Sequence, residues 1–144
     1  MEIRKILVPL DFSEYSEQAF HWAVIVAEKW QAQLLVLHVV PRTSYPLMVT
    51  GSFDIGDFEV GLRADAEAQA KEFLAKVQNR EVPIEVRTLV GEPFHDICHV
   101  AEQEQSDLIV MGSHGRTGLS HVLLGSVAER VMRHTPCPVL VVRR

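Results

Sequence analysis

Short runs of aliphatic residues recur along the chain and predict buried strands. The clearest is "AQLLVLHVV" at 32–40, which is almost continuous and stops at Pro41. A strand buried on both faces has this composition, because both of its alternating sides meet apolar neighbours. In all, we expect strands at 3–11, 32–40, 83–90, 106–112 and 138–144. The third of them alternates apolar and charged residues at 84–87, which indicates one wetter side and a position near the edge of a sheet.

Between these runs, apolar residues recur every three or four positions, which is the spacing of a helix packed on one face. The pattern predicts helices over 13–30, about 58–78, 92–105 and about 126–134. Ser13 is a candidate N-cap for the first helix, and Pro93 suits the first turn of the third. The segment 42–57 has no hydrophobic period and contains proline and glycine, so we expect an irregular loop there.

The alternation of strands and helices predicts an α/β fold, with an open parallel sheet covered by helices on both faces. We expect a single domain over residues 1–144. Right-handed crossovers restrict such a sheet to a few arrangements. Ligands of open α/β sheets bind at the carboxyl ends of the strands, where the winding direction reverses. Asp11 after the first strand, Val39 after the second and Gly112 after the fourth are therefore candidates for a site.

Charge and composition narrow the classes of partner. The chain of 144 residues carries a net charge of −5, whereas duplex nucleic acid requires a basic face, so we expect no nucleic acid partner. The negative net charge does not exclude a small anionic ligand, because such a ligand responds to the local electrostatic field and not to the total charge. No apolar run reaches the ~20 residues of a membrane span, and the opening residues do not resemble a signal peptide. We therefore expect a cytoplasmic protein without membrane contact, in which Cys98 and Cys137 are reduced and serve packing.

The segment 111–131 concentrates glycine and serine between an expected strand and an expected helix. It contains no lysine, which a Walker phosphate loop requires, and it lacks the G-x-G-x-x-G dinucleotide fingerprint. What remains is Gly112, two residues, Gly115, nine residues, then Gly125 and Ser126. Glycine lets the backbone approach a ligand and adopt positive φ, and a helix N-terminus favours phosphate. The segment is thus either an anion cradle or a connection that only needs turns.

The stretch "VMGSHGRTGLSHVLLGSVAERVMRHTPCPVLVV" resembles the C-terminal half of the universal stress protein (UspA) family. The nucleotide-binding subgroup of that family carries G-x-x-G, nine residues, then G-S/T, and every position is matched. "KILVPLDFSE", "LLVLHVV" and "SDLIVMGSHG" resemble the first, second and fourth strands of the family with the turns that follow. The resemblance covers the chain except for 42–57.

This resemblance implies an adenine nucleotide alpha hydrolase-like fold with strand order 3-2-1-4-5. It also implies an adenine nucleotide (ATP, or AMP/ADP) across the carboxyl ends of the strands. Asp11 would bind the adenosine part, the Val39 backbone would read the adenine edge, and the glycine segment would hold ribose and phosphates. The candidate binding residues are Pro9, Asp11, Val39, Met111, Gly112, His114, Gly115, Gly125, Ser126 and Val127.

The last strand, Pro138–Val142, would lie at an edge of that sheet and leave its backbone groups unpaired beside apolar side chains. Proteins normally blunt or cover such an edge. The simplest cover is the same strand of a second copy, paired antiparallel about a two-fold axis. We therefore expect a homodimer, to which the family resemblance also points.

Other candidates have simpler explanations. His95 and His99 imitate the H-E-x-x-H zinc motif, but Asp96 replaces the glutamate and no third ligand is evident, so we expect a solvated helix face and no metal. His38 lies in a buried strand, where a hydrogen-bonded core histidine is the expectation. Arg116 either neutralises a phosphate or faces solvent. A phosphorelay receiver would need a phospho-accepting aspartate after the third strand and a lysine after the fifth, and both are absent.

We therefore expect adenine-nucleotide binding with little or no turnover, in a regulatory or stress-response role. Hydrolysis needs an oriented water, usually a base, and charge stabilisation at the γ-phosphate. Ser126 could hold a Mg²⁺ ion that accompanies ATP, but no base is evident and we expect no catalytic residue. A slow Mg²⁺-dependent ATPase and a nucleotide-independent interaction protein stay open as alternatives.

Overall fold

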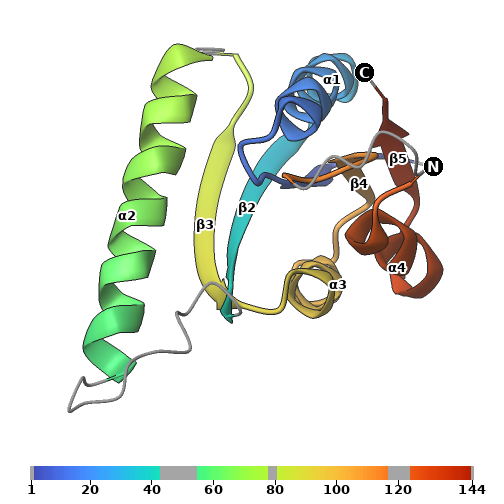
Figure 1. Ribbon diagram of the computed structural model, residues 1–144. Coiled ribbons are helices and arrows are strands. Elements are labelled where there is room, and N and C mark those ends of the chain that lie inside the picture. The colour runs from blue at the N-terminus through green and yellow to red at the C-terminus, as the bar shows by residue number, and fades with distance from the viewer. Residues whose placement is uncertain (1, 43–54, 78–80, 117–123, 144) are drawn as a thin grey trace.

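The computed structural model describes residues 2–42, 55–77, 81–116 and 124–143. The elements along the chain are β1 (Lys5–Pro9), α1 (Glu14–Trp30), β2 (Gln33–Pro41), α2 (Ile55–Lys76), β3 (Ile84–Gly91), α3 (Pro93–Gln103), β4 (Leu108–Gly112), α4 (Ser126–His134) and β5 (Val139–Val142). Strands and helices alternate (Figure 1), as the hydrophobic pattern predicts. Within the described parts of the chain, no helix is both long and apolar enough to cross a membrane.

The strands lie parallel in one five-stranded sheet, in the order β3-β2-β1-β4-β5. This confirms the predicted α/β class and strand order. The central strand β1 is the most enclosed: Ile6, Leu7 and Val8 are 0% exposed. β3 and β5 form the two edges. Glu85 and Arg87 project from the same face of β3 and pair with each other at 2.9 Å, which lets this strand carry the two charges.

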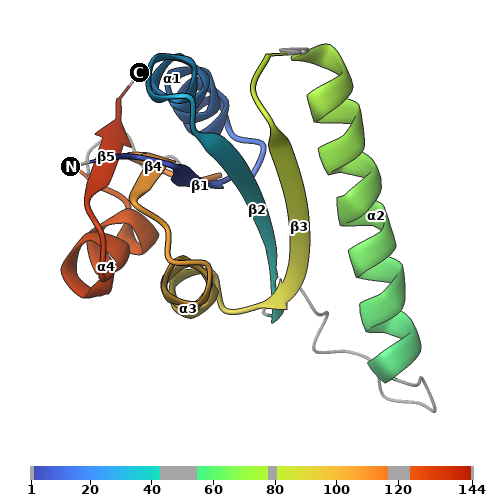
Figure 2. The same ribbon diagram turned by 180° about the vertical axis from the view of Figure 1, so that it is seen from behind.

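Each face of the sheet carries its own hydrophobic core. One core receives Phe20 from α1 and Phe73 from α2, whose rings meet edge to face at 5.3 Å. The other receives Ile97 from α3 and Val131 from α4. Successive residues of the strands point to opposite cores, because side chains alternate along a strand. Figures 1 and 2 show the resulting layers, with α1 on one side of the central strands and α3 and α4 on the other.

The helix starts follow the signals in the sequence. The Ser13 side chain accepts a hydrogen bond from the Ser16 N–H at 3.3 Å and caps α1, as expected. Pro93 is the first residue of α3, where its missing N–H costs no intrahelical bond. Gly125 is the N-cap of α4, so Ser126 opens that helix as the spacing predicts.

The start of α2 differs from the prediction. The helix begins at Ile55, three residues before Phe58, and ends at Lys76. Gly56 and Gly61 lower the helix propensity of this stretch, which hid its first turn. An acidic residue in that turn, Asp57, favours the helix through the dipole. Of the expected loop at 42–57, residues 55–57 are therefore helical, and residues 43–54 lie outside the described part of the chain.

The end of β4 packs against the start of α1 more closely than any side chain would allow. A Cβ atom added at Gly112 would lie 2.8 Å from the carbonyl carbon, carbonyl oxygen and Cβ of Tyr15. Two of these neighbours belong to the backbone of a helix turn and cannot rotate away. By contrast, a Cβ added at Gly61 of α2 would meet nothing within 4 Å.

We expect the substitutions Gly112→Ala and Gly61→Ala to change stability in opposite directions. Gly112→Ala should lower the free energy of unfolding by about 1–3 kcal/mol, the usual effect of overpacking. Gly61→Ala should raise it by about 0.5–1 kcal/mol, because alanine favours an exposed helix. Urea denaturation measures both, and a Gly112→Ala protein as stable as the parent would contradict this account of the β4–α1 contact.

Candidate functional site

The carboxyl ends of β1 and β4 lie side by side at the centre of the sheet. The two strands pair in parallel, with Ile6 opposite Leu108 and Leu7 opposite Ile109. From these ends the chain leaves in opposite directions, since α1 covers one face and α4 the other. This is the switch point at which open α/β sheets bind their ligands. Asp11 and the glycine segment both lie there.

Asp11 ties the turn after β1 to the glycine segment. Its Oδ1 accepts a hydrogen bond from the Ser13 N–H at 3.0 Å, and its Oδ2 accepts one from the Arg116 N–H at 3.1 Å. The Arg116 side chain makes a second hydrogen bond to the same residue, in which its Nε donates to the Asp11 carbonyl oxygen at 2.7 Å. The next residue, Phe12, has a φ of 62°, a left-handed conformation that a bulky residue rarely adopts. The β1–α1 turn is therefore held in one shape by contacts from the far end of the chain.

The glycines of the segment allow close approach rather than unusual backbone angles. A Cβ at Gly115 would lie 2.8 Å from Oδ2 of Asp11. A Cβ at Gly125 would lie 3.1 Å from the Ser113 carbonyl oxygen, which accepts a hydrogen bond from the Gly125 N–H at 2.7 Å. None of Gly112, Gly115 and Gly125 has a left-handed φ, so the positive φ angles expected of the cradle do not occur at these three glycines.

The start of α4 faces this cluster of glycines without a side-chain cap. Gly125 is the N-cap and has no side chain that could accept from the first N–H groups of the helix. Unpaired N–H groups at a helix start and the helix dipole are together able to bind an anion. Ser126, the first helical residue, is exposed and can turn its hydroxyl toward a ligand there. Val127 is partly buried and packs on the core beneath α3 and α4, so its N–H is the group it can offer.

His114 and Tyr15 form one wall of the cluster. The two rings lie 5.1 Å apart, and Nδ1 of His114 is 3.0 Å from the Ser113 hydroxyl. The sequence singled out His114 for its place between the glycines. It gave no reason to choose Tyr15, which lies in the first turn of α1 and meets the segment only because Gly112 is small.

The remaining candidates, Val39, Met111 and Pro9, lie within the strands. Val39 lies inside β2 rather than after it, and its side chain is 8% exposed. Met111 is 5% exposed and its side chain belongs to the core under α3 and α4. Pro9 is the last residue of β1 and lies opposite Leu37.

The position of Val39 nevertheless suits a backbone reader. The Leu10 N–H donates to the Leu37 carbonyl at 2.9 Å, so the peptide groups of Leu37 face β1. Peptide groups of alternate residues face the same neighbouring strand. The peptide groups of Val39 therefore also face β1. They lie beyond the last residue pair of β1 and β2, Pro9 and Leu37, so no β1 residue is paired with Val39.

His38 is a core histidine with a hydrogen-bond partner, as expected. It is 4% exposed, and its Nδ1 lies 2.6 Å from the Leu10 carbonyl oxygen, to which it donates. Burial lowers the pKa of His38, so the ring stays neutral next to the turn that carries Asp11. Its ring also packs on Phe12 at 4.6 Å. The His38 side chain thus stabilises the β1–α1 turn through its hydrogen bond to Leu10 and its contact with Phe12.

The motif around His95 and His99 and the two cysteines have structural explanations. Oδ2 of Asp96 accepts a hydrogen bond at 2.9 Å from the backbone N–H of Glu92, the N-cap residue of α3, so this carboxylate stabilises the start of the helix. His95 and His99 are exposed and their rings stack 6.0 Å apart. The described residues contain no group of three or more side chains that could hold a metal. Cys98 and Cys137 are free and partly buried, and burial raises the pKa of both thiols, which favours packing over redox chemistry.

Comparison with known proteins gives a family. The model described as "Universal stress protein family" matches residues 2–143. The universal stress protein MJ0531 of Methanocaldococcus jannaschii is 35% identical over 98% of this chain and 82% of its own length. Among solved structures, MJ0577 of the same organism has a TM-score of 0.85 at 30% identity, covering 100% of this chain and 98% of that one. UspA from Lactobacillus plantarum has a TM-score of 0.79 at 33% identity, covering 99% of both chains.

Two further solved structures share the fold at lower identity. A universal stress protein in complex with cAMP has a TM-score of 0.63 at 24% identity, covering 99% of this chain and 98% of that one. One from Archaeoglobus fulgidus in complex with dAMP has a TM-score of 0.67 at 22% identity, covering 98% of both chains. With its sequence matched from end to end and its sheet in the expected order, the chain belongs to the universal stress protein family.

Proposed function

We propose that the protein binds an adenine nucleotide, ATP first and AMP or ADP next, at the carboxyl ends of β1 and β4. The observation that carries the proposal is the meeting of Asp11 with the glycine segment beside the uncapped start of α4. A nucleotide has a polar nucleoside end and an anionic phosphate end. The Asp11 carboxylate offers a hydrogen-bond acceptor for the nucleoside, and the N-terminus of α4 offers N–H groups for the phosphates. Universal stress proteins of the same fold in complex with cAMP and dAMP make adenine nucleotides the first class to test.

The phosphates would lie on the α4 side of the site. The N–H groups of Ser126 and Val127 and the dipole of α4 favour negative charge there. Gly115, whose backbone approaches Asp11, would offer its N–H to the phosphates, and Arg116 adds a fixed positive charge next to it. A Mg²⁺ ion accompanying ATP would find the exposed hydroxyl of Ser126.

The nucleoside would lie on the β1 side. Each oxygen of the Asp11 carboxylate accepts one N–H bond and has lone pairs left for a ribose hydroxyl or an adenine amine. The Val39 backbone would pair with the adenine edge. Pro9, Met111 and Gly112 would form the surface beneath the sugar, with His114 beside it.

We expect binding with little turnover, in a regulatory role of the kind that the family name describes, in the cytoplasm. In-line hydrolysis requires a group that orients the attacking water. The acid of this site, Asp11, is held by backbone N–H groups at the nucleoside end. That position favours a bound nucleotide that serves as a signal over one that is consumed.

The binding proposal predicts a thermal shift that is specific to adenine nucleotides. A ligand at 100 times its dissociation constant stabilises a protein by about 2.7 kcal/mol. ATP, ADP and AMP should therefore raise the melting temperature. GTP should have a smaller effect, because the hydrogen-bonding edge of guanine differs from that of adenine. Mass spectrometry of nucleotide released from the purified protein identifies the natural ligand. If no adenine nucleotide raises the melting temperature, the proposal is wrong and an interaction protein without nucleotide becomes the better account.

The same incubation separates binding from hydrolysis. ATP kept with the protein and Mg²⁺ should be recovered intact. Steady Mg²⁺-dependent release of phosphate that disappears in Gly115→Ala would instead establish a slow ATPase at this site.

Gly125→Val tests the phosphate end of the site. A Cβ there lies 3.1 Å from the Ser113 carbonyl oxygen and 3.3 Å from Cα of His114, so a branched side chain pushes the start of α4 away from the cradle. We expect ATP affinity to fall at least about tenfold, equivalent to about 1.4 kcal/mol, while circular dichroism still shows the folded protein. Calorimetric titration measures the affinity, with Gly61→Ala in α2 as the matched control. Unchanged affinity in a folded Gly125→Val protein would mean that this glycine only makes a turn.

We also propose that two copies pair through β5. The carbonyl oxygens of Pro138 and Val142 accept bonds from β4 and the residue after it, so the peptide groups of Val139 and Val141 face outward. Leu140 adds a side chain that is 38% exposed. Antiparallel pairing of β5 about a two-fold axis would cover both features.

Val141→Pro is the sharpest test of this dimer. Proline removes an outward N–H and leaves the bonds to β4 intact, as edge strands allow. Val141→Thr, which keeps the N–H, is the control, and the buried Val142 is left unchanged because its side chain lies in the core. Light scattering should report a monomer for the proline variant and a dimer for the parent and the threonine variant. A parent protein that is monomeric at micromolar concentration would refute the proposal.

A further inference from the structure

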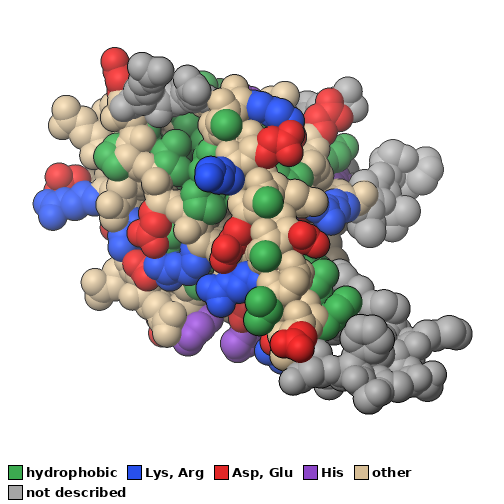
Figure 3. Space-filling model, turned by 90° about the vertical axis from the view of Figure 1, so that its left-hand side faces the viewer, with side chains coloured by type: hydrophobic (Ala, Val, Ile, Leu, Met, Phe, Trp, Pro, Cys, Tyr) green, Lys and Arg blue, Asp and Glu red, His purple; other side chains and the backbone are tan. Residues whose placement is uncertain are grey.

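A concavity lies away from the proposed nucleotide site, between α2 and the edge strand β3. Its volume is about 370 Å³, within the range of sites for small molecules. The lining residues are Arg63, Glu67, Lys71 and Leu74 from α2, and Val86, Arg87 and Thr88 from β3. Figure 3 views the molecule from the α2 side, where lysine and arginine side chains alternate with acidic ones over this region. This groove, which we call the α2–β3 groove, shares no residue with the glycine cluster.

The wall of the groove contains a buried polar atom that no described residue bonds. Thr88 is 3% exposed, and its Oγ1 is buried without a hydrogen-bond partner among the described residues. Buried side-chain polar atoms almost always have a partner in the protein or in bound water, so an exception at a cavity marks a place for a water or for a polar atom of a ligand. A hydroxyl both donates and accepts, so it suits the oxygen of an acid.

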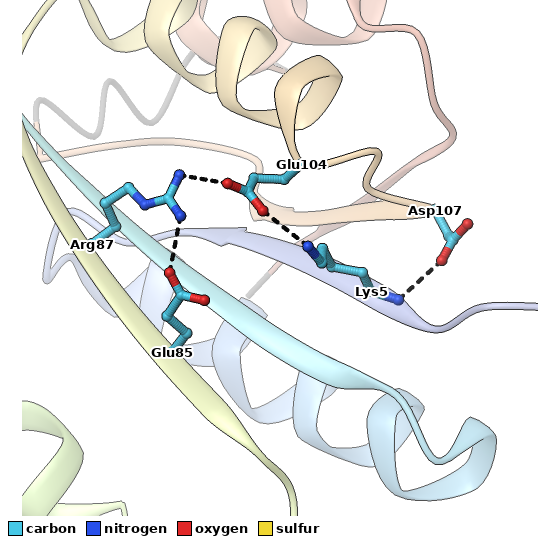
Figure 4. A network of polar contacts seen from close by, with 5 residues as sticks. All are labelled: Lys5, Glu85, Arg87, Glu104 and Asp107. Carbon is cyan, nitrogen blue, oxygen red and sulfur yellow. Dashed lines mark hydrogen bonds and ion pairs between the residues drawn. The ribbon is translucent and has the colours of Figure 1, made fainter.

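Most of the charge around the groove is already neutralised. Arg63 pairs with Glu67 at 3.2 Å within α2. Arg87 pairs with Glu85 and with Glu104, each at 2.9 Å. Figure 4 shows how this chain of ion pairs continues across the sheet face from Glu104 to Lys5 at 2.9 Å, so that two acids and two bases balance.

Lys71 is the exception. It lines the groove, its residue is exposed, and no ion pair of its ammonium group occurs among the described residues. The lining as a whole thus has one positive charge that no described residue balances. Leu74 lies one turn along the helix and Val86, 37% exposed, lies on the strand opposite, so an apolar surface adjoins the charge. The lining therefore matches a ligand with one negative charge and an apolar body.

We propose that the α2–β3 groove binds a small organic monoanion, a carboxylate with a compact apolar body. The carboxylate pairs with the Lys71 ammonium and accepts the bond that the Thr88 hydroxyl cannot make within the protein. The apolar body covers Leu74 and Val86. A dianion such as a free phosphate ester finds only one unbalanced cation here, and a neutral molecule leaves Lys71 without a partner. The proposal does not depend on nucleotide binding.

The test is an NMR titration of the ¹⁵N-labelled full chain with benzoate and hexanoate, each matched by its neutral amide, benzamide and hexanamide. The carboxylates should shift the amide signals of Leu74 and of Val86–Thr88, and the amides should shift them far less. Lys71→Gln should weaken carboxylate binding about tenfold, and Lys76→Gln, whose ammonium pairs with Glu72 outside the groove, should leave it unchanged. Thr88→Val should also weaken binding while the protein stays folded, because the hydroxyl has no protein bond to lose.

Three results would overturn the proposal. The first is the absence of shifts at the groove with either carboxylate. The second is equal binding of acid and amide, or carboxylate binding that survives Lys71→Gln, because the charge would then play no part. The third is that the carboxylates shift Gly115 and Gly125 instead, because the anions would then occupy the glycine cluster. Lys71 is exposed, so its variant should fold and gives an answer even if Thr88→Val does not.

Discussion

The structure depends on one close contact, in which the ends of two neighbouring parallel strands reach each other through glycines. β1 and β4 pair at the centre of the sheet, and the chain leaves them toward opposite faces. Gly112 lets the first turn of α1 rest on β4, and Gly115 lets the Asp11 carboxylate bond the backbone of the segment beyond. A side chain at either glycine would separate the helix start from the loop. The geometry that would hold a ligand is thus the same geometry that closes the fold.

A left-handed Phe12 and a buried His38 show where this contact is supported. The turn after β1 holds an unfavourable φ angle, which persists only where surrounding contacts determine it. The Arg116 guanidinium, the Ser13 N–H and the neutral ring of His38 supply those contacts from three directions. Asp11 is therefore presented in a fixed position before any ligand arrives, which lowers the cost of ordering it on binding.

Much of the fold was predictable because hydrophobic periodicity reports side-chain burial, and burial decides which residues form strands and helices here. The run at 32–40 became β2, the alternation at 84–87 placed β3 at an edge, and Ser13 capped α1. The strand order came from the family resemblance, since periodicity carries no information on which strands are neighbours. The start of α2 was missed because glycines weakened the local signal.

The site was less accessible to sequence reasoning. Spacing identified the glycines, and of the two properties expected of them, close approach and positive φ, Gly112, Gly115 and Gly125 show only close approach. The two hydrogen bonds from Arg116 to Asp11 join residues that lie 105 positions apart in the chain, and the contact of Tyr15 with Gly112 is similarly distant in sequence. No local pattern reports such pairs. The net charge of −5 bears on the class of partner but does not locate a site, because the fixed cations Arg116 and Lys71 act on their own surroundings.

The most direct measurement is the map of backbone amide shifts that ATP induces in the ¹⁵N-labelled protein. The account predicts shifts that converge from distant parts of the sequence on Asp11, Val39, Gly115 and residues 125–127, with the α2–β3 groove unaffected. Saturating shifts confined to another surface, or no shifts at ATP concentrations that saturate ordinary nucleotide sites, would contradict it.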